Sequence, residues 1–406
     1  MKRAVEKHHI LTIGLLLFTA SLVAMGSRRL RLPYSVGLVV AGVALAASPW
    51  KPELTLSRDL IFEIFLPPLV FEAAMQLPWR AFRRDLPVIL IYAFPGVAIA
   101  AAFVAAGMHY LLGWSWNGAA LFGTLIAATD PVAVIAAFRE LRVQPRLALL
   151  VESESLLNDG TAAVGFAILV AIATGAGGAP SDVAWMLVWT VAGGVLAGAL
   201  VTGPLLLLSG GTDDHLVEIT LSTIAAYGSF MLAERFQVSG VLASLTAGLM
   251  VGNIGRLGMV SARGRASLHD FWTYVAFLAN SIIFLLIGTN GAGLPLRLFL
   301  GAAAVAVVLM LIGRALAIYP LSLLLARTKL KVELGHQHVL FWGGLRGALA
   351  LALALALPAQ IAERREIVIV AFAVVAFSIF VQGLTMPWLI RRLGLMRAGP
   401  KGGHEG

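Results

Sequence analysis

The sequence predicts an all-α polytopic membrane protein with about 13 transmembrane helices. Its 406 residues are 59% hydrophobic and only 13% charged, and the mean hydropathy is +0.90. Soluble domains are closer to 45–50% apolar and about 25% charged. Long apolar runs also recur along the whole chain, and many approach the ~20 residues that a bilayer-spanning helix needs. A lipid solvent accounts for both observations.

Apolar segments divide the chain regularly, without a soluble domain, charged linker or low-complexity stretch between them. The predicted spans are residues 9–26, 34–49, 59–78, 86–113, 117–138, 146–174, 182–209, 216–233, 238–255, 269–289, 298–326, 337–358 and 366–390. We therefore expect residues 1–406 to form a single transmembrane domain.

The basic residues predict the orientation of these spans. Alternate loops hold nineteen of the thirty Lys and Arg residues and the opposite loops hold nine, so the richer set is expected to be cytoplasmic. This places the N-terminus outside and the C-terminus inside. The net charge of +9 is thereby assigned to membrane topology, and nucleic acid is not an expected partner. The absence of cysteine excludes disulfides and thiolate metal sites.

Two basic residues, Arg314 and Arg346, lie inside apolar spans, as do Glu72, Asp130 and a group of acids near residue 154. A charge near the bilayer centre costs at least about 2.5–3.5 kcal/mol, so such residues usually face a partner or a cavity. Glu63 and Glu152 lie nearer to span ends and are weaker candidates.

The segment from Ala128 to Val132 reads Ala-Thr-Asp-Pro-Val in the middle of a span. Pro131 has no amide hydrogen and disfavours helical geometry at Asp130, so the helix should break there. Irregular backbone at membrane depth occurs where it is buried in protein or lines a cavity. The alternative is a simple proline kink, but the adjacent Thr129 hydroxyl and Asp130 carboxylate favour an ion site.

The next span carries a second group of oxygen ligands in the segment from Glu152 to Gly160. Ser155 and Asp159 are four residues apart and share one helix face, while Glu154 and Asn158 share the neighbouring face. Carboxylate, hydroxyl and amide oxygens suit a hard cation such as sodium. The alternative is a set of purely structural polar groups.

A second interruption lies at Gly343-Gly344-Leu345-Arg346-Gly347, near the end of the second half of the chain. Paired interrupted helices in two halves are the sequence pattern of inverted-repeat transporters. We expect two inverted six-helix repeats at about 9–174 and 216–390, joined by the linking helix at about 182–209.

Five motifs occur in order along the chain, and together they are highly specific. They are FLPPLVFE from Phe65, TDP from Thr129, ESLLNDG from Glu154, GRAL from Gly313 and GGLRG from Gly343. Through them the chain resembles the sodium/proton antiporters of the cation/proton antiporter-1 family, of the prokaryotic NhaP type related to eukaryotic sodium/proton exchangers.

The resemblance implies a role for each motif residue. Asp159 would be the carboxylate that carries either the ion or the proton. The cation site would be completed by residues of three spans: Asp130, Thr129, Ser155, Glu72 and Asn158. Glu154 and Arg314 would form a structural ion pair, and Arg346 would place a positive charge where the unwound helices cross.

The resemblance also implies the activity and the setting. Asn158 stands where electrogenic relatives have a second aspartate, which implies electroneutral one-for-one exchange of sodium, and of lithium, for protons, and a role in pH homeostasis. Sodium ions, protons and membrane lipid are the implied partners, together with a second copy in a homodimer, and no cofactor is implied. Eukaryotic relatives carry long regulatory tails, so the short tail here points to a prokaryotic inner membrane.

Three other functions remain open at this stage. Potassium/proton exchange differs only in cavity size, which motifs do not fix. A cation channel would be expected to build its pore from symmetric rings, whereas these polar groups are asymmetric within one chain. A membrane enzyme would need a metal cluster, nucleophile elbow or phosphate loop, and no such motif occurs.

Overall fold

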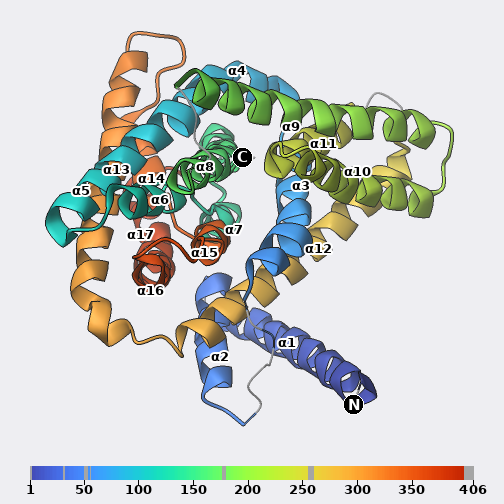
Figure 1. Ribbon diagram of the computed structural model, residues 1–406. Helices are drawn as coiled ribbons and strands as arrows, with labels where there is room; N and C mark the ends of the chain where they lie inside the picture. Colours follow the sequence, from blue (N-terminus) through green and yellow to red (C-terminus); the bar gives the residue numbers. More distant parts are fainter. Residues whose placement is uncertain are drawn as a thin grey trace, which may run out of the picture.

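The computed structural model describes residues 2–30, 33–49, 54, 56–175, 180–254 and 260–396. Across these ranges the chain is helical and contains no strand beyond a single antiparallel bridge between Val143 and Met396 (Figure 1). The protein is a polytopic all-α membrane protein, as predicted.

The helices pack into two bundles that touch along a narrower boundary. The scaffold bundle consists of α1 (Lys2–Leu30), α2 (Tyr34–Ala46), η1 (Leu60–Phe65), α3 (Leu66–Gln76), α9 (Pro180–Ser209), α10 (His215–Arg235), α11 (Gly240–Asn253) and α12 (Ala262–Gly291). In Figure 1 it forms the right-hand and lower part of the molecule.

The core bundle forms the left-hand part of the same view. It consists of α4 (Trp79–Ile91), η2 (Tyr92–Gly96), α5 (Val97–Leu112), α6 (Trp116–Leu125), α7 (Val132–Leu141), α8 (Pro145–Ala173), η4 (Leu296–Phe299), α13 (Leu300–Leu325), α14 (Leu334–Trp342), α15 (Ala348–Leu355), α16 (Arg364–Phe377), η5 (Ser378–Gly383) and α17 (Leu384–Arg392).

Each of the predicted spans coincides with one helix or with consecutive helical pieces. Within the described ranges, seven helices are long and apolar enough to cross a bilayer by length and composition, and three shorter apolar helices accompany them. Two predicted spans are instead broken pairs, α6 with α7 and α14 with α15. Residue 255, at the end of one predicted span, lies outside the described residues.

Wide π-helical turns interrupt three spans, at η1, η2 and η5. A proline lies inside or just after each of them, at Pro67, Pro95 and Pro387. Because proline offers no N–H to the carbonyl four residues earlier, the helix there must adjust its hydrogen bonding. These spans therefore continue through the membrane with local widening rather than ending.

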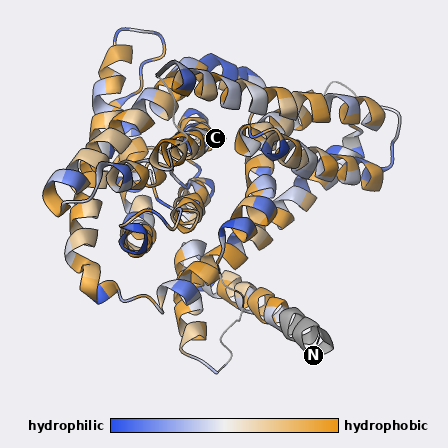
Figure 2. Cartoon of the chain, in the orientation of Figure 1, coloured by the Kyte–Doolittle hydropathy of each residue, from blue (hydrophilic) through white to orange (hydrophobic). Residues whose placement is uncertain are grey.

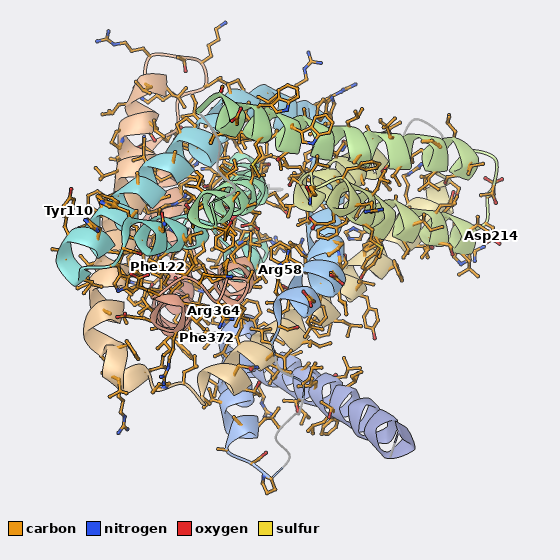
Figure 3. All side chains as sticks on the ribbon, in the orientation of Figure 1. Arg58, Tyr110, Phe122, Asp214, Arg364 and Phe372 are labelled. Atoms are coloured by element: carbon orange, nitrogen blue, oxygen red, sulfur yellow. The ribbon has the colours of Figure 1, made fainter. Side chains whose placement is uncertain are left out.

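Large apolar side chains cover the outside of both bundles. Leu207, Met231 and Leu323 are 68%, 67% and 73% exposed. Figure 2 shows that hydrophobic residues predominate along the helices of both bundles, while hydrophilic residues gather towards loops and helix ends. In Figure 3 Asp214 marks one such loop, at the tip of the α9–α10 hairpin. This surface suits lipid.

Small residues allow close helix approach inside the scaffold bundle. A Cβ atom added to Gly42 of α2 would lie 3.0 Å from the Cα atom of Gly288 on α12. A Cβ atom on Gly194 of α9 would press against Ser239 at the start of α11. Without a hydrophobic drive between helices in lipid, such close contact supplies the packing energy.

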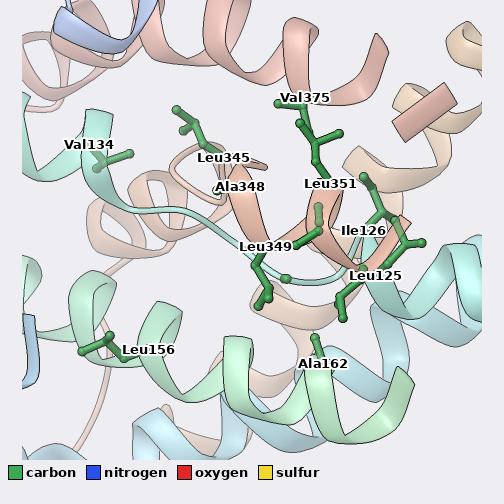
Figure 4. Close-up of a cluster of buried hydrophobic side chains, with 14 of the residues drawn as sticks. Leu125, Ile126, Val134, Leu156, Ala162, Leu345, Ala348, Leu349, Leu351 and Val375 are labelled. Atoms are coloured by element: carbon green, nitrogen blue, oxygen red, sulfur yellow. The ribbon is translucent and has the colours of Figure 1, made fainter. Parts of the chain in front are cut away.

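The two broken spans meet in the middle of the core bundle. The backbone N–H of Asp130, between α6 and α7, donates a hydrogen bond to the carbonyl of Leu345, between α14 and α15, at 2.7 Å. Figure 4 shows apolar side chains packed around this crossing, among them Val134, Leu156 and Leu349. The unwound crossing helices are thus present, while the division into inverted repeats stays a prediction.

The predicted orientation also stays a prediction. Residues 397–406 of the C-terminal tail lie outside the described part of the chain, as do Arg31, Lys51 and Arg256.

Candidate ion-binding site

A cavity of about 340 Å³ lies on the boundary between the two bundles. Its scaffold wall comes from α2, α3 and α12, and its core wall from the two crossing segments and α8. The polar and charged side chains on the wall are Tyr34, Glu72, Thr129, Asp130, Arg139, Glu152, Asp159, Thr273 and Asn280.

Asp130 lies between the N-termini of two half-helices. Its carboxylate accepts a hydrogen bond from the N–H of Val132, the first residue of α7, at 2.9 Å. The backbone of Ala348, the first residue of α15, also hydrogen-bonds to this carboxylate. Helix N-termini present unpaired N–H groups and partial positive charge, so one carboxylate stabilises both of them.

Arg346 places a positive charge at the C-terminus of a half-helix, α6. Its guanidinium donates hydrogen bonds to the carbonyls of Ala127 at 2.7 Å and Ala128 at 2.9 Å, just beyond the end of α6. The residue is 2% exposed. A cation beside a helix C-terminus offsets its partial negative charge. The crossing therefore carries a negative group at two N-termini and a positive group at one C-terminus.

A hydrogen-bond network fixes the unwound segment against α8. Ser155 donates its only hydrogen to the Thr129 carbonyl at 2.9 Å, so Thr129 is the donor in the 2.6 Å contact between the two hydroxyls. Asn158 donates to the Thr129 hydroxyl at 2.6 Å, and its oxygen accepts the Thr129 N–H at 3.1 Å. The N–H, carbonyl and hydroxyl groups of Thr129 are thus all hydrogen-bonded to Ser155 or Asn158.

Glu154 and Arg314 form a buried bidentate ion pair between α8 and α13, with N–O distances of 2.8 and 2.9 Å. Asn158 adds a hydrogen bond to the Glu154 carboxylate at 2.9 Å. Arg314 also donates to the carbonyl of Leu340, at the end of α14. With its charge and hydrogen bonds satisfied, this pair ties three core elements together.

Asp159 is placed differently from the other acids of α8. It lines the cavity, and its buried Oδ1 atom has no hydrogen-bond partner among the residues that the structure describes. Buried polar atoms are nearly always satisfied, and exceptions call for a functional explanation. A carboxyl group on a cavity wall with one buried oxygen unpaired is a candidate to hold a cation or a proton.

The structure divides the predicted cation ligands into two groups. Asp159, Asp130, Thr129 and Glu72 line the cavity. Ser155 and Asn158 are buried behind Thr129 and are not part of its wall. Their roles as direct ligands stay predictions.

Several residues on the cavity wall or beside it were not singled out from the sequence. Gln76 follows Glu72 by one helical turn and hydrogen-bonds to it, and this spacing was the signal that could have identified it. Arg139 directly follows the predicted span 117–138, so the sequence identified it only as one of the nineteen basic residues of the richer set of loops. Thr273 and Asn280 are seven residues apart on α12, a spacing that places both on one helix face, but only the fold reveals that this face borders the cavity.

Known sequences match nearly the whole chain. A profile described as sodium/hydrogen exchanger, transmembrane, matches residues 14–392. The Na(+)/H(+) antiporter ApNhaP of Aphanothece halophytica is 38% identical over 95% of this chain and 74% of its own length. The Na(+)/H(+) antiporter NhaH of Halobacillus aidingensis is 32% identical over 96% of this chain and 99% of its own length.

A solved structure matches the fold. The sodium proton antiporter MjNhaP1 from Methanocaldococcus jannaschii at pH 8 superposes with a TM-score of 0.75, at 20% identity, over 95% of this chain and 99% of its own. A second structure of MjNhaP1 gives 0.77 at 19% identity, over 96% and 99%. The resemblance drawn from the five motifs is confirmed, and the chain belongs to the sodium/hydrogen exchanger family.

Proposed function

We propose that this protein is a secondary active transporter that exchanges sodium, and also lithium, for protons. The observation that carries the proposal is the Asp159 carboxyl group, which belongs to a residue of the interbundle cavity wall and has a buried Oδ1 atom without a hydrogen-bond partner among the described residues. Curated relatives that match nearly the whole chain are named Na(+)/H(+) antiporters, which supports the choice of ions and argues against an enzyme.

The chemistry follows from the oxygens that the cavity presents. Sodium is a hard cation, and Asp159, Asp130, Thr129 and Glu72 offer carboxylate and hydroxyl oxygens to it. A cation binds only the deprotonated carboxylate, so sodium and a proton compete for Asp159. Asn158 and Ser155 act by holding Thr129 in place.

Coupling follows from the cost of moving an unpaired charge. An empty Asp159 carboxylate would be a buried, uncompensated charge during movement across the membrane, whereas the sodium-loaded and protonated forms are neutral. The carrier then moves only when loaded, by one ion in each direction. The neutral amide at Asn158 leaves Asp159 as the single exchanging carboxylate, which makes the cycle electroneutral.

The arrangement of two bundles suits alternating access. The site elements α7, α8 and α15 belong to the core bundle, and the opposite wall of the cavity belongs to the scaffold bundle. A rigid shift of one bundle against the other would expose Asp159 to each side in turn.

We further propose a homodimer in a prokaryotic inner membrane, with the C-terminus cytoplasmic and a role in pH homeostasis.

The proposal is tested by proton flux into sealed proteoliposomes that contain a pH-sensitive dye. Sodium or lithium, but not choline, should drive a pH change that Asp159→Asn abolishes and that an imposed voltage does not increase. Asp213→Asn, a change of the same chemistry in an exposed loop, should retain the flux. If Asp159→Asn retained sodium-driven flux, or if only potassium drove it, the proposal would be wrong.

A further inference from the structure

A chain of hydrogen bonds crosses between the two bundles beside the cavity. The Arg139 guanidinium, in the last turn of α7, donates to the Gln76 side-chain oxygen at 3.0 Å. The Gln76 amide nitrogen donates in turn to the Glu72 carboxylate, one helical turn earlier on α3. A core helix is thereby connected, through one amide, to a carboxylate on the opposite wall.

The chemistry of the two outer groups fixes the direction of this chain. Arginine has only donors and an ionised carboxylate has only acceptors. The Gln76 amide can satisfy both only with its oxygen towards Arg139 and its NH₂ towards Glu72. Arg139 thus orients the amide, and the amide orients Glu72.

The same amide keeps two opposite charges apart. Arg139 and Glu72 both line the cavity, yet Arg139 forms no ion pair within the described part of the chain. Glu152 on α8 lines the cavity as well. A direct Arg139–Glu72 pair would occupy the carboxylate that an entering cation needs.

We propose that Gln76 and Arg139 are positioning residues for sodium binding: Arg139 fixes the Gln76 amide, and Gln76 holds Glu72 towards the cavity while separating it from Arg139. This inference rests on the proposed function, because it assumes that sodium reaches Asp159 through this cavity. The positioning of Glu72 is expected to affect the affinity for sodium and not the rate of the bundle movement that transports the ion.

The first experiment measures the KM and maximal rate of sodium-driven proton flux. Gln76→Met keeps the length of the side chain but removes both hydrogen bonds, and should raise the sodium KM about tenfold with a maximal rate within twofold of wild type. Arg139→Met should raise KM in the same direction, and Arg139→Lys, which can still donate to the amide oxygen, should restore it. Arg83→Met, which removes an exposed positive charge from α4, is the matched control and should leave KM unchanged.

The second experiment asks whether Gln76 acts through Glu72. In a Glu72→Gln background, which should itself bind sodium more weakly, Gln76→Met should have no further effect on KM, because no carboxylate remains to be positioned. An equal effect of Gln76→Met in both backgrounds, an unchanged KM, or a loss confined to the maximal rate would overturn the inference. A wild-type protein without sodium-driven flux would instead contradict the proposed function.

Discussion

Asn158 uses its entire amide to hold its neighbours. Its NH₂ group donates to Glu154 and to the Thr129 hydroxyl, and its oxygen accepts from the Thr129 backbone. Asn158→Asp would replace the NH₂ group and its two donated hydrogens by a single acceptor oxygen, placed 2.9 Å from a Glu154 carboxylate oxygen. Each unsatisfied buried group costs about 1–3 kcal/mol, and the two carboxylates would repel each other.

We therefore expect Asn158→Asp to lower the thermal unfolding midpoint and the transport rate, rather than to produce a well-folded electrogenic carrier. The measurement is unfolding in detergent together with flux under an imposed voltage. A stable variant whose flux increased with voltage would show that a second carboxylate can be accommodated here.

The Glu154–Arg314 pair makes a separate prediction. Removing one partner leaves a buried charge unpaired, so Glu154→Gln or Arg314→Met should each destabilise the protein by about 3–5 kcal/mol. The double variant should lose less than the sum of the two, because it leaves no uncompensated charge. Chemical unfolding of all three variants checks this. A Glu154→Gln protein of normal stability but weakened sodium affinity would move Glu154 into the ion site.

The two unwound segments approach closely where Gly347 passes Asp130. A Cβ atom added to Gly347 would overlap the Asp130 carboxyl group. Gly347→Ala should therefore cost about 1–3 kcal/mol of stability and displace the carboxylate that stabilises α7 and α15. We expect at least a tenfold loss of sodium-driven flux.

Gly301→Ala on α13 is the matched control, because no atom lies within 4 Å of its added Cβ atom. It should change stability by no more than about 1 kcal/mol and leave flux unaltered. Equal flux in both variants would mean that the crossing tolerates displacement of Asp130.

Hydropathy predicted the location of the membrane spans more accurately than the residues at which the helices begin and end. α4 begins at Trp79, seven residues before its predicted span, because its first turns carry arginines that remain helical outside the apolar region. The break at Pro131 was predictable, since proline removes a local hydrogen bond. The π turn at η2 was not, because Pro95 could equally have produced a kink or a break.

The sequence predicted those parts of the site whose residues lie within one span. Asp130 and Asp159 could be identified as buried carboxylates from single spans. The Gln76–Arg139 contact could not, since it joins residues 63 positions apart from two different bundles. Hydropathy and helical spacing report single elements, whereas this contact depends on how the bundles pack.

Across the whole molecule, alternating access requires the two bundles to change their contacts, and the link between Gln76 and Arg139 lies on their boundary. The chain has no cysteine, so introduced thiols can be cross-linked selectively. In a Gln76→Cys, Arg139→Cys variant, a bifunctional methanethiosulfonate, which links the two thiols through disulfide bonds, should abolish exchange at saturating sodium, and a reductant that cleaves those bonds should restore it. Either single variant treated in the same way should remain active.

A cross-link inside one bundle distinguishes lost bundle movement from general damage. Ser115 and Glu363 are hydrogen-bonded at 2.8 and 3.0 Å, and both lie at helix starts within the core bundle. Linking cysteines at these two positions should leave exchange intact, because a rigid core keeps this contact throughout the cycle. If the interbundle link were tolerated and the core link were not, transport would depend on movement inside the core bundle, and the boundary beside Gln76 would be static.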